Sequence, residues 1–303
     1  MKRKPIAQIL FLSAIWGASF LLIRVAGQTF PPFWIALMRS GLGAILLWTV
    51  LFASGTRPPA RKFLPALVLV GLFNNAIPFT CFAWGEQVVP SNTASVLNAT
   101  TPIWTLLISM AAHRARAGWT VIGGVLLGFA GVVLVVFNQS ASEPASVTHA
   151  QFLRGCVLIT VGTVGYGIAT VTAKAKLQGV DPLGIAASQL GLAALMVAPL
   201  AIAVSRPSHL HLDNWLAIAL LGFAGSGIAY LLYFHLLTTI SATHVVAVTY
   251  LLPIWGVFWG AIAHEHIGSG TFYGVAVAIA GLVLMNLRRT QPAVLTPQRV
   301  PAD

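Results

Sequence analysis

Ten long apolar stretches, separated by short polar segments, run along the chain. They lie at about residues 5–26, 31–53, 64–84, 91–111, 118–137, 152–173, 182–204, 213–237, 241–262 and 268–287. A helix needs roughly 20 apolar residues to cross a hydrocarbon core of about 30 Å, and each stretch has about that length. Continuous runs of this kind favour helices over the short alternating strands of a β-barrel. The pattern predicts an all-α integral membrane protein with ten transmembrane helices.

The composition excludes a water-soluble class. Of 303 residues, 57% are apolar and 8% are charged, with a mean hydropathy of +0.86, whereas soluble proteins carry roughly 25% charged residues. The expected partner is therefore the lipid bilayer. A net charge of +11 does not indicate a nucleic-acid partner, because the basic residues are dispersed among short loops and tails. Cys81 and Cys156 lie in apolar stretches and are expected to be free, buried thiols.

The basic residues predict the orientation of the chain. With ten spans and the amino terminus inside, the outside loops hold only Arg24, Arg154 and Arg206, and Arg39 lies within a span. The remaining 13 of the 17 Lys and Arg residues fall in inside loops and tails. Positive residues concentrate on the cytoplasmic side of membrane proteins, so both termini are predicted to be cytoplasmic.

The second half of the chain repeats the first, about 150 residues later. Thr101-Pro102-Ile103-Trp104 recurs as Leu252-Pro253-Ile254-Trp255. Five spans per half is an odd number, so the two repeats must enter the membrane in opposite directions, which suits alternating access to a central site. The predicted domains are a first repeat at 5–138, an extracytoplasmic linker at 139–150, a second repeat at 151–288 and a cytoplasmic tail at 289–303.

Polar and aromatic side chains recur at steps of three and four along several spans, so they share one helix face. Such a face either packs against another helix or lines a substrate cavity. The glycine stripes of 118–137 and 268–287 favour packing, whereas asparagine and tyrosine bring more hydrogen-bonding capacity than packing requires. The expected substrate-binding residues in a central cavity are Trp16, Asn75, Asn98, Pro102, Tyr230, Tyr233 and Tyr250.

Two prolines occupy equivalent positions in the two repeats. Pro102 and Pro253 each remove one helix hydrogen bond and are predicted to kink their spans. The carbonyl groups freed at mid-membrane either face a cavity or lie beside a kink that only shapes the bundle.

Few charged or titratable groups lie in or near the spans. Arg39 lies roughly 12 Å deep at 1.5 Å per residue, and we expect a structural role in which it snorkels to the headgroups or pairs with a carboxylate. Glu86, His235 and His244 are the possible proton-coupling residues. The alternatives are a solvated loop carboxylate for Glu86 and structural, hydrogen-bonded histidines for the other two.

The sequence offers little enzyme chemistry. The run His264-Glu265-His266 is not the HExxH zinc pattern, because its histidines are two residues apart and point to different helix faces. The chain lacks a GxSxG elbow and a GxxxxGK[ST] phosphate loop, and it has only six acidic residues. We therefore predict no catalytic residues, no metal site and no cofactor.

Four segments carry a resemblance to a known family: Trp16-Gly17-Ala18-Ser19-Phe20, Leu37-Met38-Arg39, the run 91–104, and Ala263-His264-Glu265-His266-Ile267. With the repeat, they make the chain similar to EamA-type transporters of the drug/metabolite transporter superfamily from about residue 7 to 288. The family's acidic residue after the fourth span is present as Glu265 in the second repeat, but Arg114 takes its place in the first.

The resemblance implies a secondary transporter in a bacterial inner membrane, often an exporter of amino acids or related small metabolites. It also implies a cavity lined by the spans at 5–26, 64–84, 91–111, 152–173, 213–237 and 241–262. The sequence itself indicates no obligate protein partner. The alternatives are an importer, a carrier of drug-like or lipophilic substrates and a membrane-embedded enzyme. The motifs specify neither the substrate nor the coupling ion.

Overall fold

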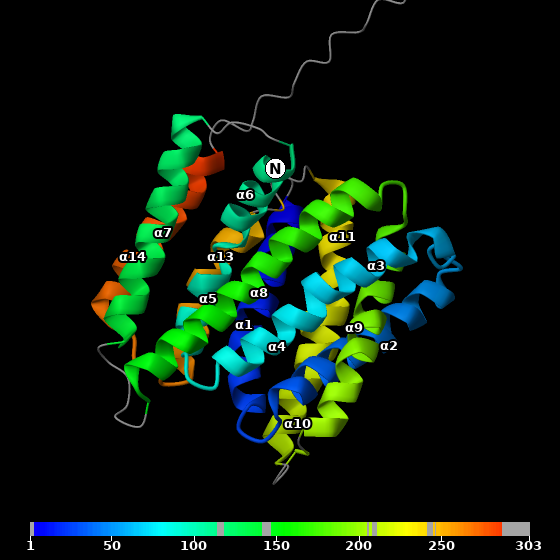
Figure 1. The fold of residues 1–303 in the computed structure, drawn as a ribbon, viewed down its shortest axis with the longest axis horizontal. Helices are drawn as coiled ribbons and strands as arrows, with labels where there is room; N and C mark the ends of the chain where they lie inside the picture. The colour runs from blue at the N-terminus through cyan, green and yellow to red at the C-terminus, as the bar shows by residue number, and fades with distance from the viewer. Residues whose placement is uncertain are drawn as a thin grey trace, which may run out of the picture.

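The computed structural model describes residues 3–113, 118–140, 147–204, 206–207, 211–240, 245 and 247–286. These residues form helices and connecting turns, with no strand among them (Figure 1). Most predicted stretches fold as single helices, which are α1 (Arg3–Ala26), α2 (Pro32–Ala53), α7 (Trp119–Ser140), α8 (His149–Lys176), α9 (Pro182–Val204), α13 (Ala247–Ile262) and α14 (Ser269–Asn286). Three stretches are composite.

Length and composition make this an all-helical membrane fold. Within the described residues, eight helical segments are long and apolar enough to cross a membrane, and Val248–Ile262 and Ser269–Met285 are two shorter apolar helices. Each predicted apolar stretch falls on one of these segments. Many large apolar side chains point away from the bundle, among them Phe137 (69% exposed) and Leu195 (72% exposed). An apolar perimeter of this kind suits lipid.

Two of the composite spans change helix type near their middle. The span from Arg61 to Gly85 comprises a 3₁₀ turn (Arg61–Phe63), α3 (Leu64–Gly71), the π-helical η2 (Leu72–Ala76) and α4 (Ile77–Gly85). The span from Leu212 to Thr239 comprises α10 (Leu212–Ala219), the π-helical η3 (Leu220–Ile228) and α11 (Ala229–Thr239). These are the third spans of the two halves. The 3.6-residue pattern did not predict either π segment, and such segments are frequent at functional sites.

The fourth apolar stretch is broken in two, as its proline indicated. α5 (Ser91–Asn98) ends before α6 (Thr101–His113) begins, and Pro102 occupies the first turn of α6, where its missing N–H costs nothing. The hydroxyls of Thr100 and Thr101 donate to the carbonyls of Leu97 and Asn98 at 2.6 and 2.7 Å. The second repeat differs, because α13 stays helical through Pro253.

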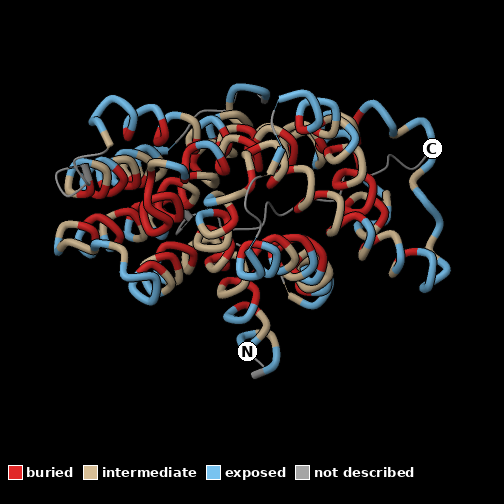
Figure 2. Tube along the Cα trace, turned by 90° about the horizontal axis from the view of Figure 1, so that it is seen from below, coloured by how far each residue is buried: buried red, intermediate tan, exposed pale blue. Residues whose placement is uncertain are grey.

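The helices pack in pairs that join the two halves of the sequence. α7 and α14 lie side by side on one flank, and α2 and α9 pack together on the other (Figure 1). Between them, α1 packs along α13, where Trp255 Nε1 donates to Ser13 Oγ at 2.9 Å. Figure 2 shows the buried residues on the inner helix faces and the exposed residues around the perimeter.

α7 and α14 touch backbone to backbone. A Cβ atom on Gly131 would lie 2.3 Å from the Ala278 backbone nitrogen, and one on Gly281 would lie 2.3 Å from the Gly128 nitrogen. Small residues permit this approach in membrane helices. The packing interpretation of the two glycine stripes is therefore confirmed.

Substituting Gly131→Ala is expected to lower the melting temperature of the detergent-purified protein, because overpacking at backbone contacts costs about 1–3 kcal/mol. The matched control is Gly123→Ala on the same helix, whose added Cβ would meet only Leu284 Cδ2 at 3.8 Å. That change should leave the melting temperature unchanged or raise it, since alanine favours helix by about 1 kcal/mol over glycine. Equal melting temperatures for the two variants would contradict the close backbone contact.

Candidate functional site

A polar cluster forms where the two π segments meet the rest of the bundle. The Tyr230 hydroxyl accepts hydrogen bonds from Asn74 Nδ2 at 2.8 Å and from Asn75 Nδ2 at 3.3 Å, and Asn74 Nδ2 also lies 3.3 Å from Gln189 Oε1. We call these four residues the tyrosine cluster. Asn75 is fully buried, and its Oδ1 has no hydrogen-bond partner among the described residues. The cluster joins η2 of the first half to α9 and α11 of the second.

Arg39 lies beside this cluster and remains inside the bundle. It is 8% exposed, and its Nε donates to Ser226 Oγ in η3 at 3.2 Å. The guanidinium carbon lies 3.9 Å from the centroid of the Phe79 ring, in cation–π geometry. In the described parts of the chain, no carboxylate comes within ion-pair distance of Arg39. The side chain thus neither reaches the surface nor forms the carboxylate pair considered from the sequence.

Aromatic rings from both halves line the interior next to the tyrosine cluster. Trp16 and Tyr233 stack at a tilt with centroids 5.6 Å apart, and Trp16 Nε1 donates to the Gly225 carbonyl at 3.2 Å. Phe82 lies 5.8 Å from Phe20 and 6.1 Å from Tyr166. Rings from α1 and α11 therefore form one group, and rings from α1, α4 and α8 form another.

A carboxylate ties the two halves together at the end of the bundle where α5 begins. Glu265 accepts from the backbone nitrogens of Ser91 at 2.9 Å and Asn92 at 3.1 Å, so it caps the amino terminus of α5. It also pairs with Arg24 at 3.4 Å, while its own side chain is 4% exposed. His264 has a φ of 57°, a left-handed turn that directs Glu265 back toward α5.

Glu86 is the second carboxylate at this end. It follows directly after α4, is 3% exposed, and neither of its oxygens has a hydrogen-bond partner within the described residues. Burial raises the pKa of the Glu86 carboxyl well above its ordinary value of 4.5; the charge of Glu265 adds to this, and Arg24 and Arg39 oppose it. The neutral form is therefore favoured.

The structure brings together some of the predicted site residues and separates others. Trp16, Asn75, Tyr230 and Tyr233 converge as described. Asn98 ends α5 with a buried Oδ1 that lacks a partner in the described chain. The remaining residues lie elsewhere, with Pro102 in the first turn of α6, the Tyr250 hydroxyl 3.4 Å from the Leu282 carbonyl on α14, His235 exposed and His244 outside the described residues.

Four residues of this region were absent from the predicted site. Asn74 sits next to Asn75, and the π segment lets both reach Tyr230. Gln189 and Ser226 are ordinary polar residues within spans, and Tyr166 lies between two glycines. For Gln189 the sequence held one signal: it lies 150 residues after Arg39 and so occupies the equivalent position in the second repeat.

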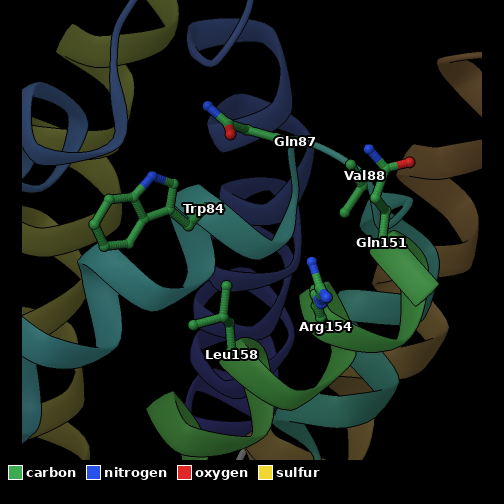
Figure 3. Close-up of a pocket in the computed structure, with 7 residues that line it drawn as sticks. Trp84, Gln87, Val88, Gln151, Arg154 and Leu158 are labelled. Carbon is green, nitrogen blue, oxygen red and sulfur yellow. The ribbon is translucent and has the colours of Figure 1, made fainter. Parts of the chain in front are cut away.

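A surface pocket of about 300 Å³ lies where the end of α4 faces the start of α8 (Figure 3). Its lining consists of Trp84, Gln87, Val88, Gln151, Arg154, Gly155 and Leu158. Several of these residues are exposed, and none belongs to the tyrosine cluster or the aromatic interior. No group of three or more potential metal ligands occurs in the described portion of the chain.

The arrangement matches one family over nearly the whole chain. Residues 3–137 and 153–287 each match the EamA-like transporter family. The chain belongs to this family. It is therefore an integral membrane protein of a transporter family.

Relatives of this EamA-family chain span its full length. It is 27% identical to the uncharacterized inner membrane transporter YedA of Escherichia coli (strain K12), over 93% of this chain and 91% of that protein. It is 23% identical to the "Probable terminal-alkyne amino-acid exporter" of Streptantibioticus cattleyicolor, over 95% of both. A solved crystal structure shares the fold with a TM-score of 0.67 at 18% identity, covering 96% of this chain and 100% of that one.

Replacing Glu265→Ala in this EamA-family protein is expected to lower the unfolding free energy by about 1–3 kcal/mol, because two backbone donors lose their acceptor. Arg24→Ala should cost only about 0–1 kcal/mol, since the Arg24 side chain is 43% exposed. Melting temperatures from tryptophan fluorescence measure both. Equal losses would mean that the ion pair, and not the helix cap, holds this end together.

The raised pKa of Glu86 predicts how stability depends on pH. The stability contributed by the neutral carboxyl is complete below its ordinary pKa of 4.5 and is lost as the pH rises through the raised value. The melting temperature of Glu86→Gln should therefore fall less than that of the wild type as the pH rises above 4.5. Asp213→Asn, at an exposed carboxylate, should follow the wild type. Identical profiles for wild type and Glu86→Gln would refute the shift.

Proposed function

We propose that this protein is a secondary transporter that exports small metabolites, such as amino acids or related compounds, by alternating access. Its ten apolar helical segments act as transmembrane helices arranged as two inverted five-helix repeats, 5–138 and 151–288. The segment 139–150 links them outside the cytoplasm, and 289–303 forms a cytoplasmic tail. The distribution of basic residues supports this orientation, with both termini in the cytoplasm.

One observation carries the proposal: the polar groups of the tyrosine cluster come from both halves of the chain. Asn74 and Asn75 of the first half donate to Tyr230 of the second, away from lipid. Inverted-repeat transporters bind substrate at this interface, near the middle of the membrane. When the halves separate, these hydrogen bonds break, and a polar substrate can bond to the amide and hydroxyl groups that become free.

The aromatic interior and the relatives support the substrate class and the location. Trp16, Phe82, Tyr166 and Tyr233 offer ring faces beside polar groups, an arrangement typical of small-molecule sites. One relative is named as an amino-acid exporter and another as an inner membrane transporter. We therefore place this protein in a bacterial inner membrane, with the bilayer and a small-molecule substrate as its partners.

The contacts of Glu265 indicate which side of the protein is closed in the proposed transport cycle. In the predicted orientation, the contact of Glu265 with Arg24 and the start of α5 lies on the extracytoplasmic side. The conformation described here would then be closed to the outside. Release of substrate would require that α5 and the end of α13 separate, with water taking over the two backbone donors.

Metabolite profiling of the growth medium tests the proposal. Cells producing the wild type should accumulate one class of small metabolite outside, compared with cells carrying an empty vector. Tyr230→Phe keeps the ring but removes the hydroxyl, and should lower export about two- to tenfold at equal protein level. Tyr273→Phe, the same change at a side chain 70% exposed on α14, is the matched control.

Each other outcome points away from export. Identical media from wild-type and empty-vector cells would contradict an exporter and lead to uptake assays for an importer. Accumulation of lipophilic compounds alone would favour a carrier of drug-like substrates. Conversion of a metabolite without movement across the membrane would favour a membrane-embedded enzyme.

A further inference from the structure

The guanidinium of Arg39 has most of its hydrogen-bonding capacity unused. An arginine side chain carries five N–H donors, and within the described structure only Nε has a partner, Ser226 Oγ at 3.2 Å. The residue as a whole is only 8% exposed. Its terminal nitrogens, Nη1 and Nη2, are nevertheless not among the side-chain atoms that are fully enclosed and without a partner. The terminal N–H groups are therefore not completely enclosed by the described protein atoms.

No carboxylate among the described residues neutralises this charge at close range. Glu265 is engaged with Arg24 and with the start of α5, and Glu86 makes no hydrogen bond or ion pair. Asp181 accepts from backbone nitrogens at the start of α9, and Asp213 is exposed in the first turn of α10. A cation inside a membrane protein is costly unless it is paired. Glu86 is an electrostatic neighbour of Arg39 but forms no ion pair with it. An anion at the terminal N–H groups would supply the missing pair.

The surroundings of Arg39 suit the remainder of an organic ligand. The Phe79 ring lies against the guanidinium, and the phenol groups of Tyr166 and Tyr230 are its electrostatic neighbours. Asn75, bonded to Tyr230, adds an acceptor oxygen without a partner in the described chain. The space around Arg39 thus offers cationic, aromatic and polar groups from α2, η2, α4, α8 and α11.

We propose that Arg39 binds the carboxylate of the transported substrate, so that the substrates are small carboxylic acids, amino acids among them. The terminal N–H groups of an arginine form a fork that matches the two oxygens of a carboxylate. The part of this inference that concerns transport rests on the function proposed above. The repeat equivalent of Arg39 is Gln189, which belongs to the tyrosine cluster, so the two halves supply one cation between them.

Carboxylate binding can be tested on the purified protein without any transport. The probes are phenylacetate and its neutral isostere phenylacetamide, at constant ionic strength, and the readout is the concentration dependence of the melting temperature. Phenylacetate should stabilise the wild type at concentrations about tenfold or more below those at which phenylacetamide does so. Equal responses to the two compounds, or no response to either, would overturn the proposal.

Variants then locate the site. Arg39→Gln should lose the preference for phenylacetate, and Arg39→Lys, which keeps the charge without the fork, should retain part of it. Arg154→Gln removes an exposed cation and should behave as the wild type. A full preference in a folded Arg39→Gln protein would overturn the assignment. If Arg39→Gln does not fold, an undiminished preference in Arg39→Lys would overturn the bidentate fork.

This experiment separates the two proposals. Export that is unaffected by the carboxylate of the exported compound would leave the proposed transport standing and remove the role of Arg39. Binding of phenylacetate at Arg39 in a protein that moves no metabolite would preserve the anion site and contradict the transport function.

Discussion

A polar group inside a bilayer finds no water, so the protein itself must supply its hydrogen-bond partner. The broken and irregular parts of this bundle follow from that constraint. Where the fourth span breaks, the hydroxyls of Thr100 and Thr101 bond the carbonyls that precede them. Where α5 begins, the carboxylate of Glu265 bonds two backbone nitrogens. The groups that still lack a partner are therefore informative, and one of them is Oδ1 of Asn75, whose amide nitrogen donates to Tyr230.

The elements of the fold were predictable because membrane helices leave a strong signal of length and composition. Each apolar stretch became a helical segment, and Pro102 marked a real interruption. The glycine stripes were correctly interpreted as packing surfaces, since α7 and α14 meet at Gly131 and Gly281. These features depend on local residue chemistry, which a single sequence displays directly.

The site was predicted only in part, because it depends on how the helices turn. A π segment adds a residue to a helical turn and shifts every later side chain around the axis. Asn74 and Asn75 both reach Tyr230 for this reason, whereas regular spacing suggested Asn75 alone. Tyr250 belongs to a polar stripe that the sequence displays, and in the structure its hydroxyl donates to the Leu282 carbonyl on α14.

The backbone contact between α7 and α14 also affects how the molecule can move. Helices that touch at Gly128, Gly131 and Gly281 have no side-chain layer between them, so a displacement of one against the other would bring their backbones into collision. One helix of that pair belongs to each repeat. In the alternating access proposed above, this pair would bind the last helix of the first repeat to the last helix of the second, so the two repeats would stay joined on this flank while they separate elsewhere.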